Sequence, residues 1–260
     1  MHLFLRNTRV KKNRLKSKMF YTREGITGVN IILGDAYRDI KKIDDHSVDL
    51  IITDPPYDLN YCKRKNELGS ITKSMSKLME DLKDADVIGG INYIILDEFV
   101  RIMKKINIYI FCNKRQILQY LNYFVGKHQC SFEILLWIKS NPVPNCSNKY
   151  LNDKEYCLFF RKGVQMNMIY ERAHTYWITP TNKKDKLLYQ HPTVKPQNII
   201  EQLVLNSSNV GDTVLDPFLG SGTTAAAAIK WKRNFIGFEK NEKYYRIAKQ
   251  RCLNIEVMRK

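Results

Sequence analysis

Strand-length apolar segments alternate with segments of helical period along most of the chain, and this alternation constrains the fold more than any other feature. The strand segments are 29–33, 47–53, 107–111, 132–138, 156–160, 213–215 and 234–238. The helical segments are 36–43, 91–105, 114–124, 196–206, 222–231 and the segment that starts at residue 242. Strands that alternate with helices form parallel sheets with helices on both faces. The sequence therefore predicts an α/β fold with a doubly wound, mostly parallel sheet of seven strands.

Two of the strand segments, 132–138 and 156–160, follow each other without a helix between them. Because parallel neighbours need a long crossover, this pair is predicted to be antiparallel and to lie at one edge of the sheet. We expect a single domain over residues 29–260, since a chain of 260 residues with 44% hydrophobic content can form one large core.

Residues 1–28 carry eight Lys and Arg residues before the first acidic residue, Glu24. We interpret this segment as a flexible basic arm that contacts phosphates. A disordered tail without function, or a true start at Met19, fits the sequence equally well.

The charge of the chain favours a polyanionic partner. It has 43 Lys and Arg residues against 26 Asp and Glu, a formal net charge of +17. Nucleic acid is the first candidate, although a general bias toward lysine would give the same total. The six cysteines form no Cys-x-x-Cys pair and the five histidines do not cluster with them, so no metal site is expected. Free thiols in apolar segments, and no apolar stretch of about 20 residues, predict a cytoplasmic protein without a membrane span.

A glycine loop follows the strand segment 213–215. It reads Asp-Pro-Phe-Leu-Gly-Ser-Gly-Thr-Thr over 216–224 and leads into an alanine-rich helix. Glu239 ends the next strand, 19 residues past Gly220, close to the spacing at which an acidic residue meets ribose hydroxyls in nucleotide-binding folds. The loop lacks the third glycine of the dinucleotide fingerprint and the Gly-Lys-Thr of a triphosphate loop, which disfavours NAD and ATP. A helix cap with packing glycines is the alternative interpretation.

A second loop, Asp54-Pro55-Pro56-Tyr57, follows the strand segment 47–53. The residues of this loop suit a reaction at the exocyclic amino group of a nucleobase. The nitrogen of such a group is a poor nucleophile because its lone pair is delocalised into the ring. Asp54 and the Pro55 carbonyl offer acceptors for its two N–H groups and stabilise the positive charge that develops on the nitrogen. Tyr57 offers an aromatic face for a base taken out of the duplex. Taken alone, this tetrapeptide is more simply read as a strand that two prolines terminate.

Together the two loops resemble those of the amino-directed DNA methyltransferases, which modify N6 of adenine or N4 of cytosine. The Asp-Pro-Pro-Tyr loop precedes the glycine loop, an order typical of the permuted β group, and the resemblance covers about 30–251. It implies the Rossmann-like fold of these enzymes, S-adenosylmethionine as cofactor and double-stranded DNA as substrate. It implies catalytic roles for Asp54, Pro55, Pro56 and Tyr57. It implies cofactor contacts for Asp35, Ala36, Asp54, Thr193, Lys195, Asp216, Phe218, Gly220, Ser221, Gly222, Thr223, Thr224 and Glu239.

Some of these roles compete with simpler interpretations. Asp35 is expected near the amino group of the cofactor adenine, where a generic turn is the alternative. Thr193 and Lys195 are expected to hold the cofactor carboxylate; a proline-initiated helix explains Pro196 but not the lysine. His191 is expected to be a surface imidazole.

The resemblance divides the domain into a catalytic half (29–162), a target-recognition insert (163–190) and a cofactor half (191–260). The short insert predicts a short recognition sequence. The candidate DNA contacts are Lys63, Arg64, Lys65, Asn141, Asn145, Tyr170, Arg172, His174, Tyr176, Lys183 and Lys184. For each charged residue taken alone, a solvated surface group is the simpler interpretation, and Asn141 and Asn145 are equally turn formers.

The main prediction is site-specific methylation of adenine N6, by base flipping and direct transfer, because Asp rather than Ser at position 54 resembles the adenine-specific members. Cytosine N4 is the alternative base. RNA and protein glutamine are disfavoured by the permuted order, and a DNA-binding protein that has lost catalysis is disfavoured by the intact loops. The resemblance allows a homodimer and a separately acting cognate restriction endonuclease, although no residue identifies either.

Overall fold

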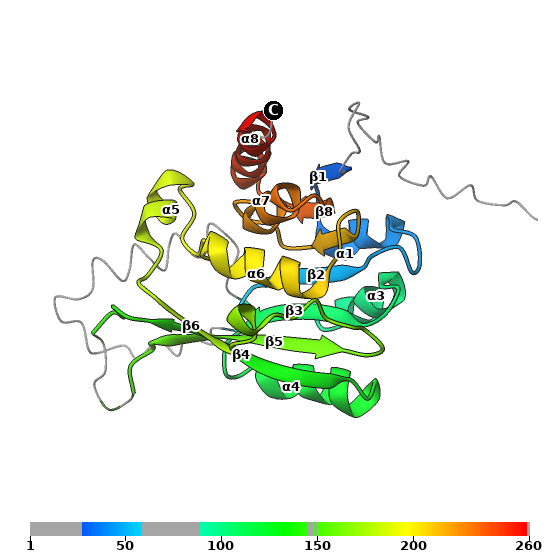
Figure 1. The fold of residues 1–260 in the computed structure, drawn as a ribbon, viewed down its shortest axis with the longest axis horizontal. Helices are drawn as coiled ribbons and strands as arrows, with labels where there is room; N and C mark the ends of the chain where they lie inside the picture. Colours follow the sequence, from blue (N-terminus) through cyan, green and yellow to red (C-terminus); the bar gives the residue numbers. More distant parts are fainter. Residues whose placement is uncertain (1–27, 59–88, 145–147, 149, 259–260) are drawn as a thin grey trace, which may run out of the picture.

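The computed structural model describes residues 28–58, 89–144, 148 and 150–258, and its centre is one eight-stranded sheet (Figure 1). The strands are β1 (Val29–Leu33), β2 (Leu50–Thr53), β3 (Asn107–Cys112), β4 (Ser131–Lys139), β5 (Lys154–Arg161), β6 (Tyr176–Thr179), β7 (Thr213–Asp216) and β8 (Asn234–Glu239). The α-helices are α1 (Ala36–Asp39), α3 (Ile95–Ile102), α4 (Ile117–Leu121), α5 (Lys183–Leu188), α6 (Gln197–Ser207), α7 (Thr223–Lys230) and α8 (Glu242–Met258). Residues 1–27 of the predicted basic arm lie outside the described residues, as do Lys63, Arg64, Lys65 and Asn145.

The strand order is β1-β8-β7-β2-β3-β5-β4-β6. Only β5 runs against the others, because it pairs antiparallel with both β3 and β4 while every other described pairing is parallel. The central strands β2 and β3 are buried at every position, as expected for strands covered on both faces. The predicted doubly wound, mostly parallel fold is confirmed.

The sequence predicted seven strands with the antiparallel pair at one edge of the sheet, and both the number of strands and the edge were wrong. The antiparallel pairing of β4 and β5 is present, but β6 adds an eighth strand beyond β4 and forms the edge. This strand has four residues, of which only Trp177 is buried. Its short and mostly exposed segment resembles a loop in composition, so an apolar pattern could not reveal it.

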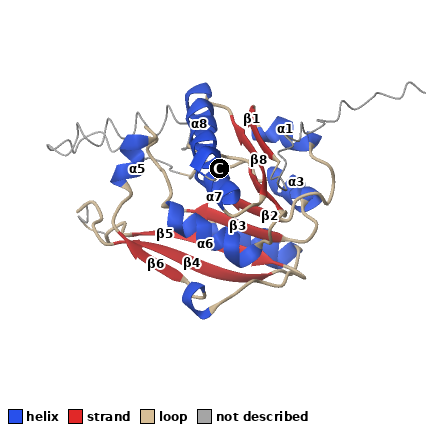
Figure 2. Cartoon of the chain, turned by 45° about the horizontal axis from the view of Figure 1, so that its top comes forward, coloured by secondary structure: helices blue, strands red, loops and turns tan. Residues whose placement is uncertain are grey.

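Helices cover both faces of the sheet, as the ribbon views show (Figures 1 and 2). Side chains of α6, α7 and α8 pack in one hydrophobic core, and side chains of α1, α3 and α4 pack in another. Several predicted helices are shorter than expected. The segment 36–43 ends in a 3-10 turn (Ile40–Lys42), and 114–124 divides into α4 and a π-helical turn (Asn122–Lys127).

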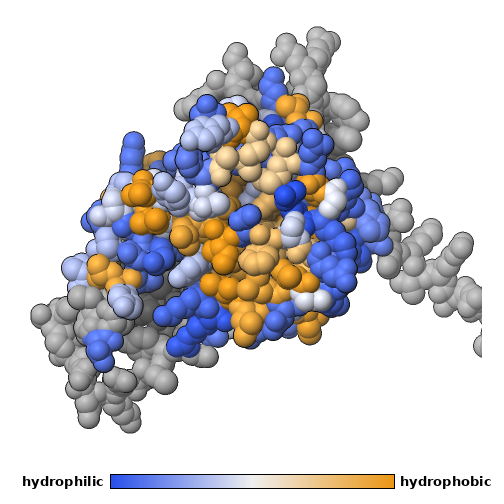
Figure 3. Space-filling view, turned by 60° about the horizontal axis from the view of Figure 1, so that its bottom comes forward, coloured by the Kyte–Doolittle hydropathy of each residue, from blue (hydrophilic) through white to orange (hydrophobic). Residues whose placement is uncertain are grey.

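Among the described residues, no helix is long and apolar enough to cross a membrane. The same part of the chain contains no cluster of three or more His, Cys, Asp or Glu side chains that could hold a metal ion. Large apolar side chains are exposed on α4 and β4, namely Leu118, Phe132 and Ile134. An apolar area is visible on the side of the molecule where these elements lie (Figure 3).

Candidate active site

A cavity of about 250 Å³ opens where the carboxyl ends of the parallel strands meet. Its lining includes Asp35 after β1, Asp54 after β2, Asp216 at the end of β7 and Glu239 at the end of β8. Ligands of open α/β sheets bind in this position. The structure therefore brings the two predicted loops to one cavity, although they are far apart in the sequence.

The Asp54 carboxylate lies between a lysine and the cavity. Its Oδ2 accepts a short hydrogen bond from Nζ of Lys195, while its Oδ1 is buried and makes no hydrogen bond within the described part of the chain. Burial raises the pKa of Asp54 above its usual value, although the positive charge of Lys195 opposes the shift. One carboxylate oxygen is thus held in place and the other is available as an acceptor.

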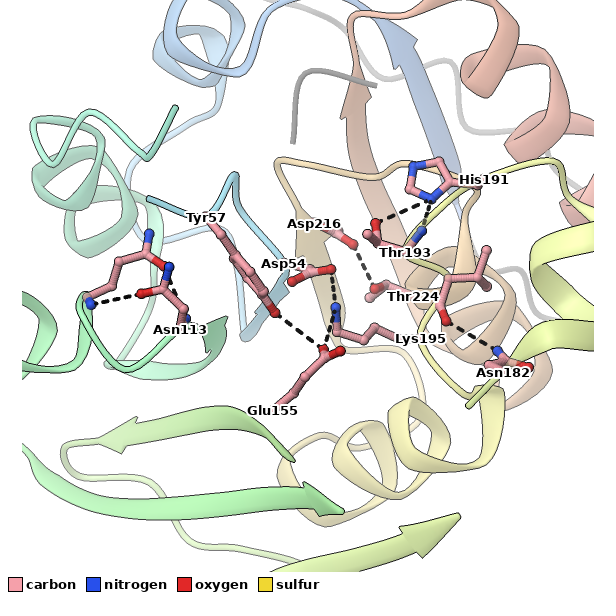
Figure 4. Close-up of polar contacts among 12 residues, drawn as sticks. Asp54, Tyr57, Asn113, Glu155, Asn182, His191, Thr193, Lys195, Asp216 and Thr224 are labelled. Atoms are coloured by element: carbon pink, nitrogen blue, oxygen red, sulfur yellow. Dashed lines mark hydrogen bonds and ion pairs between the residues drawn. The ribbon is translucent and has the colours of Figure 1, made fainter. Parts of the chain in front are cut away.

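A row of alternating charges continues beyond Asp54. Lys195 Nζ also lies 3.2 Å from Glu155 Oε2 (Figure 4). Lys139 Nζ lies 2.7 Å from Glu155 Oε1. Tyr57 donates its hydroxyl to Glu155 Oε2 over 3.4 Å. Burial raises the pKa of Glu155, but Lys195 and Lys139 outweigh burial and bring it down to about 2, so this carboxyl is ionised. Neither Glu155 nor Lys139 was found by the sequence analysis.

The backbone of the Asp-Pro-Pro-Tyr loop is fixed by side chains that follow β3. Gln116 is buried and donates from Nε2 to the Pro56 carbonyl over 3.2 Å. Asn113 donates from Nδ2 to the Asp58 carbonyl over 2.8 Å. The sequence analysis did not identify Asn113 or Gln116. Many polar residues occur in loops that follow strands, and no pattern in the sequence distinguishes these two.

The glycine loop turns through left-handed backbone at two positions. Gly220 has φ 54° and Gly222 has φ 82°, and Gly222 caps α7 at its start. A Cβ at Gly220 would lie 3.1 Å from Nε2 of His191, so the absence of a side chain keeps this part of the cavity open. Such an open cradle of backbone fits the carboxylate and amino groups of an amino-acid moiety.

Two acidic side chains tie the glycine loop to the sheet. Asp216 accepts from the Thr224 hydroxyl at Oδ2 (2.7 Å) and from the Phe218 amide at Oδ1 (3.1 Å). Burial raises its pKa to about 7, against the opposing effect of these hydrogen bonds. Glu239 accepts from the Gly220 amide over 2.8 Å and lines the cavity.

His191 is not at the surface, contrary to the sequence analysis. Its side chain packs edge-on against Tyr244 at 4.4 Å between ring centroids, and the residue is 7% exposed. Burial, followed by the charges of Lys195 and other lysines, lowers its pKa to about 4. The Thr193 amide donates to Nδ1 over 3.2 Å, so the neutral ring carries its proton on Nε2, the atom nearest Gly220.

Comparison with known proteins assigns the family. The model of the N6/N4 methyltransferase family, described as DNA methylase, matches residues 48–250. The chain belongs to this family. It is 30% identical to the type II methyltransferase M2.LlaDCHI of Lactococcus lactis subsp. cremoris, over 91% of this chain and 93% of the relative. It is 29% identical to the type II methyltransferase M2.DpnII of Streptococcus pneumoniae, again over 91% and 93% of the two chains.

Solved structures of DNA methyltransferases share the fold. The crystal structure of the M1.HpyAVI complex with S-adenosylmethionine matches with a TM-score of 0.59 and 29% identity, over 86% of this chain and 99% of that one. The cytosine-N4-specific PvuII DNA methyltransferase matches with a TM-score of 0.62 and 15% identity, over 89% and 92%. This chain is a DNA methyltransferase of the N6/N4 family, its cofactor is S-adenosylmethionine and its substrate is DNA.

The cavity of this methyltransferase is lined by aromatic, acidic and glycine-loop residues. Tyr37 and Phe218 meet edge-to-face at 5.9 Å between ring centroids, and both line the cavity together with Asp35. Asp35 is also the N-cap of α1, with Oδ1 accepting from the Tyr37 amide over 2.8 Å. Residues of the glycine loop and Glu239 belong to the same lining.

The predicted DNA contacts do not all lie together. Lys183 and Lys184 begin α5, which follows the carboxyl end of β6 and so starts on the side of the cavity. Tyr170, Arg172 and His174 precede the amino end of β6 instead. Arg172 donates from Nε to Asn206 Oδ1 over 2.9 Å, near the end of α6 and away from the cavity.

Two further candidates have structural contacts. Asn141 Oδ1 accepts from the Thr181 amide, which joins the ends of β4 and β6. Tyr176 is the first residue of the edge strand β6 and is exposed. The segment 163–190 therefore contributes the strand β6 to the sheet. A role in DNA recognition stays a prediction for each of these residues.

Proposed function

We propose that this DNA methyltransferase modifies N6 of adenine within a short recognition sequence. The observation that carries the proposal is the buried, unpaired Oδ1 of Asp54 at the cavity, in a carboxylate whose other oxygen is held by Lys195. In this proposal Oδ1 and the Pro55 carbonyl accept the two N–H bonds of the flipped base. These acceptors stabilise the positive charge that grows on nitrogen during transfer. Tyr57 stacks on the base.

The proposal assigns the remaining cavity residues to the cofactor, which supplies a methyl group on a sulfonium. Glu239 binds the ribose hydroxyls, and Asp35 with Ala36 lies at the adenine. The glycine loop binds the methionine moiety through Phe218, Gly220, Ser221, Thr223 and Thr224. Gly222 provides the left-handed turn of the loop, and Asp216 fixes its start. Thr193 stays assigned to the carboxylate group. Lys195 is assigned to Asp54 instead, because its Nζ is already bonded to two carboxylates.

Cytosine N4 is the second candidate, because the fold does not discriminate between the bases: a cytosine-N4-specific enzyme shares it. The choice depends on site residues, and Asp54 supports adenine. The test is to incubate the protein with S-adenosylmethionine and unmethylated double-stranded DNA, then to identify methylated nucleosides by mass spectrometry. N6-methyladenine is expected, and N4-methylcytosine would overturn the choice of base while leaving the mechanism intact.

We also propose that the enzyme is a homodimer that works alongside a separate restriction endonuclease. The exposed apolar residues of α4 and β4 support the dimer, since such areas often mark interfaces between proteins. The type II names of the relatives support the restriction partner. Light scattering coupled to size-exclusion chromatography tests the first part, and a monomeric mass at micromolar concentration would contradict it.

A further inference from the structure

Four charged side chains form one buried row beside the cavity, in the order Lys139, Glu155, Lys195 and Asp54. Their side chains are 16%, 19%, 7% and 23% exposed, so water screens the interactions only weakly. Tyr57 joins the row because its hydroxyl bonds to Glu155. Glu155 thus contacts both Lys195 and Tyr57 (Figure 4).

The direction of β5 explains how Glu155 reaches the site. Parallel strands bring their carboxyl ends to the cavity, whereas the antiparallel β5 brings its amino end there. Glu155 is the second residue of β5 and pairs in register with Trp137 of β4, two residues before Lys139. The backbone of Glu155 is therefore held in a strand that has neighbours on both sides, which restricts its movement far more than a loop would.

The row is electrically neutral, with two ammonium and two carboxylate groups. Loss of the Glu155 charge leaves a surplus of one positive charge, close to an amino nitrogen that itself becomes positive during transfer. It also leaves Lys195 with a single carboxylate partner. Both effects act on the reacting geometry without removing any group that touches the substrate.

We propose that Glu155 is a positioning residue for methyl transfer, which holds Lys195 against Asp54 and fixes the Tyr57 ring. The inference rests on the proposed roles of Asp54 and Tyr57 in binding the target base. Lys139 is the counter-charge that keeps Glu155 ionised and in place. Since the same contacts serve adenine and cytosine amino groups, the inference does not depend on which base is methylated.

The test compares Glu155→Gln, Lys139→Gln and the double variant with the wild type, in single-turnover and steady-state methylation of DNA. Glu155→Gln keeps the size of the side chain and an oxygen for Tyr57 but removes the charge. We expect kcat to fall at least tenfold, with the Kd for S-adenosylmethionine, measured by calorimetry, changing less than threefold. The double variant restores neutrality, so it is expected to recover a large part of the lost kcat.

Asp97→Asn is the matched control. Asp97 also accepts from a tyrosine hydroxyl (Tyr123, 2.6 Å) and a lysine (Lys127, 2.8 Å), but it lies on α3, outside the cavity lining. Its kcat is expected to equal that of the wild type. Thermal unfolding of each variant shows whether it is folded. If Glu155→Gln is not, Glu155→Asp tests the contacts instead, because it keeps the charge but shortens the reach to Lys195 and Tyr57, and an unchanged kcat in it would overturn the positioning role.

The outcomes are distinct from those that test the proposed function. A wild-type kcat in Glu155→Gln, or losses in the two single variants that simply add in the double variant, would overturn the positioning role. N4-methylcytosine as product would overturn the adenine proposal and leave this comparison valid. Full activity of Asp54→Ala would instead remove the basis of both proposals.

Discussion

Gly220 donates its backbone N–H to Oε2 of Glu239 over 2.8 Å, and the two residues belong to different strand–loop units. The other carboxylate oxygen of Glu239 accepts from the Asn241 amide, also over 2.8 Å. Glu239 therefore fixes the glycine loop and the end of β8 relative to each other while it lines the cavity. A residue predicted to bind ribose also shapes the loop predicted to bind methionine.

Glu239→Ala is expected to weaken the binding of S-adenosylmethionine before it affects catalysis. The substitution removes the proposed ribose acceptor and leaves the Gly220 amide without its partner, and a lost hydrogen bond to a charged group costs about 1.5 to 3 kcal/mol. The Kd should rise at least about tenfold. Calorimetric titration measures it, with Glu239→Gln as the milder variant. An unchanged Kd would rule out the ribose role.

Asp54→Ala is expected to abolish most methyl transfer and to spare cofactor binding. The substitution removes the acceptor oxygen proposed to face the amino group and leaves Lys195 with Glu155 alone. Loss of one preorganised electrostatic contact typically costs about 100- to 1000-fold in rate. Single-turnover methylation measures the rate, and calorimetry measures the cofactor affinity. Full activity of the variant would contradict the role assigned to Asp54.

Whether a site residue could be predicted from the sequence depended on its position along its strand. Asp54, Asp216 and Glu239 follow or end apolar parallel strands, and the carboxyl ends of such strands meet at one edge, so their convergence was predictable. Glu155 reaches the same edge from the start of an antiparallel strand. No periodicity in the sequence indicates that the start of this strand lies at the cavity. The exposed edge strand β6 was missed because burial, and therefore apolar alternation, is weak there.

Burial of His191 predicts a loss of stability in acid. Its pKa is lowered to about 4 in the folded protein, against 6.5 as the ordinary value. His191 therefore takes up a proton near pH 6.5 in the unfolded chain but only near pH 4 in the folded protein. The stability that depends on the neutral imidazole is fully present above pH 6.5. It is lost as the pH falls from 6.5 to about 4, which lowers the free energy of unfolding by up to about 3 kcal/mol.

Thermal unfolding of His191→Gln and the wild type between pH 4 and pH 7 measures this effect. Asp216 acts in the opposite direction, because its pKa is raised to about 7 and its stability contribution is lost as the pH rises through that value. The difference in Tm between variant and wild type is therefore compared at each pH. The effect of Asp216 cancels in this difference because both proteins contain Asp216. This difference should shift in favour of the variant as the pH falls. His174→Gln, at an exposed position, serves as control, and parallel curves for His191→Gln would contradict the prediction.

Gly222→Ala is expected to destabilise the cofactor loop for two separable reasons. The backbone at Gly222 has φ 82°, and an added Cβ would lie 2.9 Å from Cβ and 3.0 Å from Cα of Ala248 in α8. Left-handed backbone costs an alanine about 1 to 2 kcal/mol, and overpacking adds about 1 to 3 kcal/mol. Gly211→Ala isolates the first cost, since Gly211 has φ 86° and no atom within 4 Å of the added Cβ.

Urea unfolding of these variants measures both costs. Gly222→Ala should lose clearly more free energy of unfolding than Gly211→Ala, and Gly126→Ala, with open space around its Cβ, should lose little. Ala248→Gly removes one of the two contacting atoms, so adding it to Gly222→Ala should return part of the lost stability relative to Ala248→Gly alone. Because the loop lies between α8 and the cavity, the Kd for S-adenosylmethionine should rise in Gly222→Ala and stay at the wild-type value in Gly211→Ala. Equal losses in the two glycine variants would show that close packing against α8 does not determine the shape of the loop.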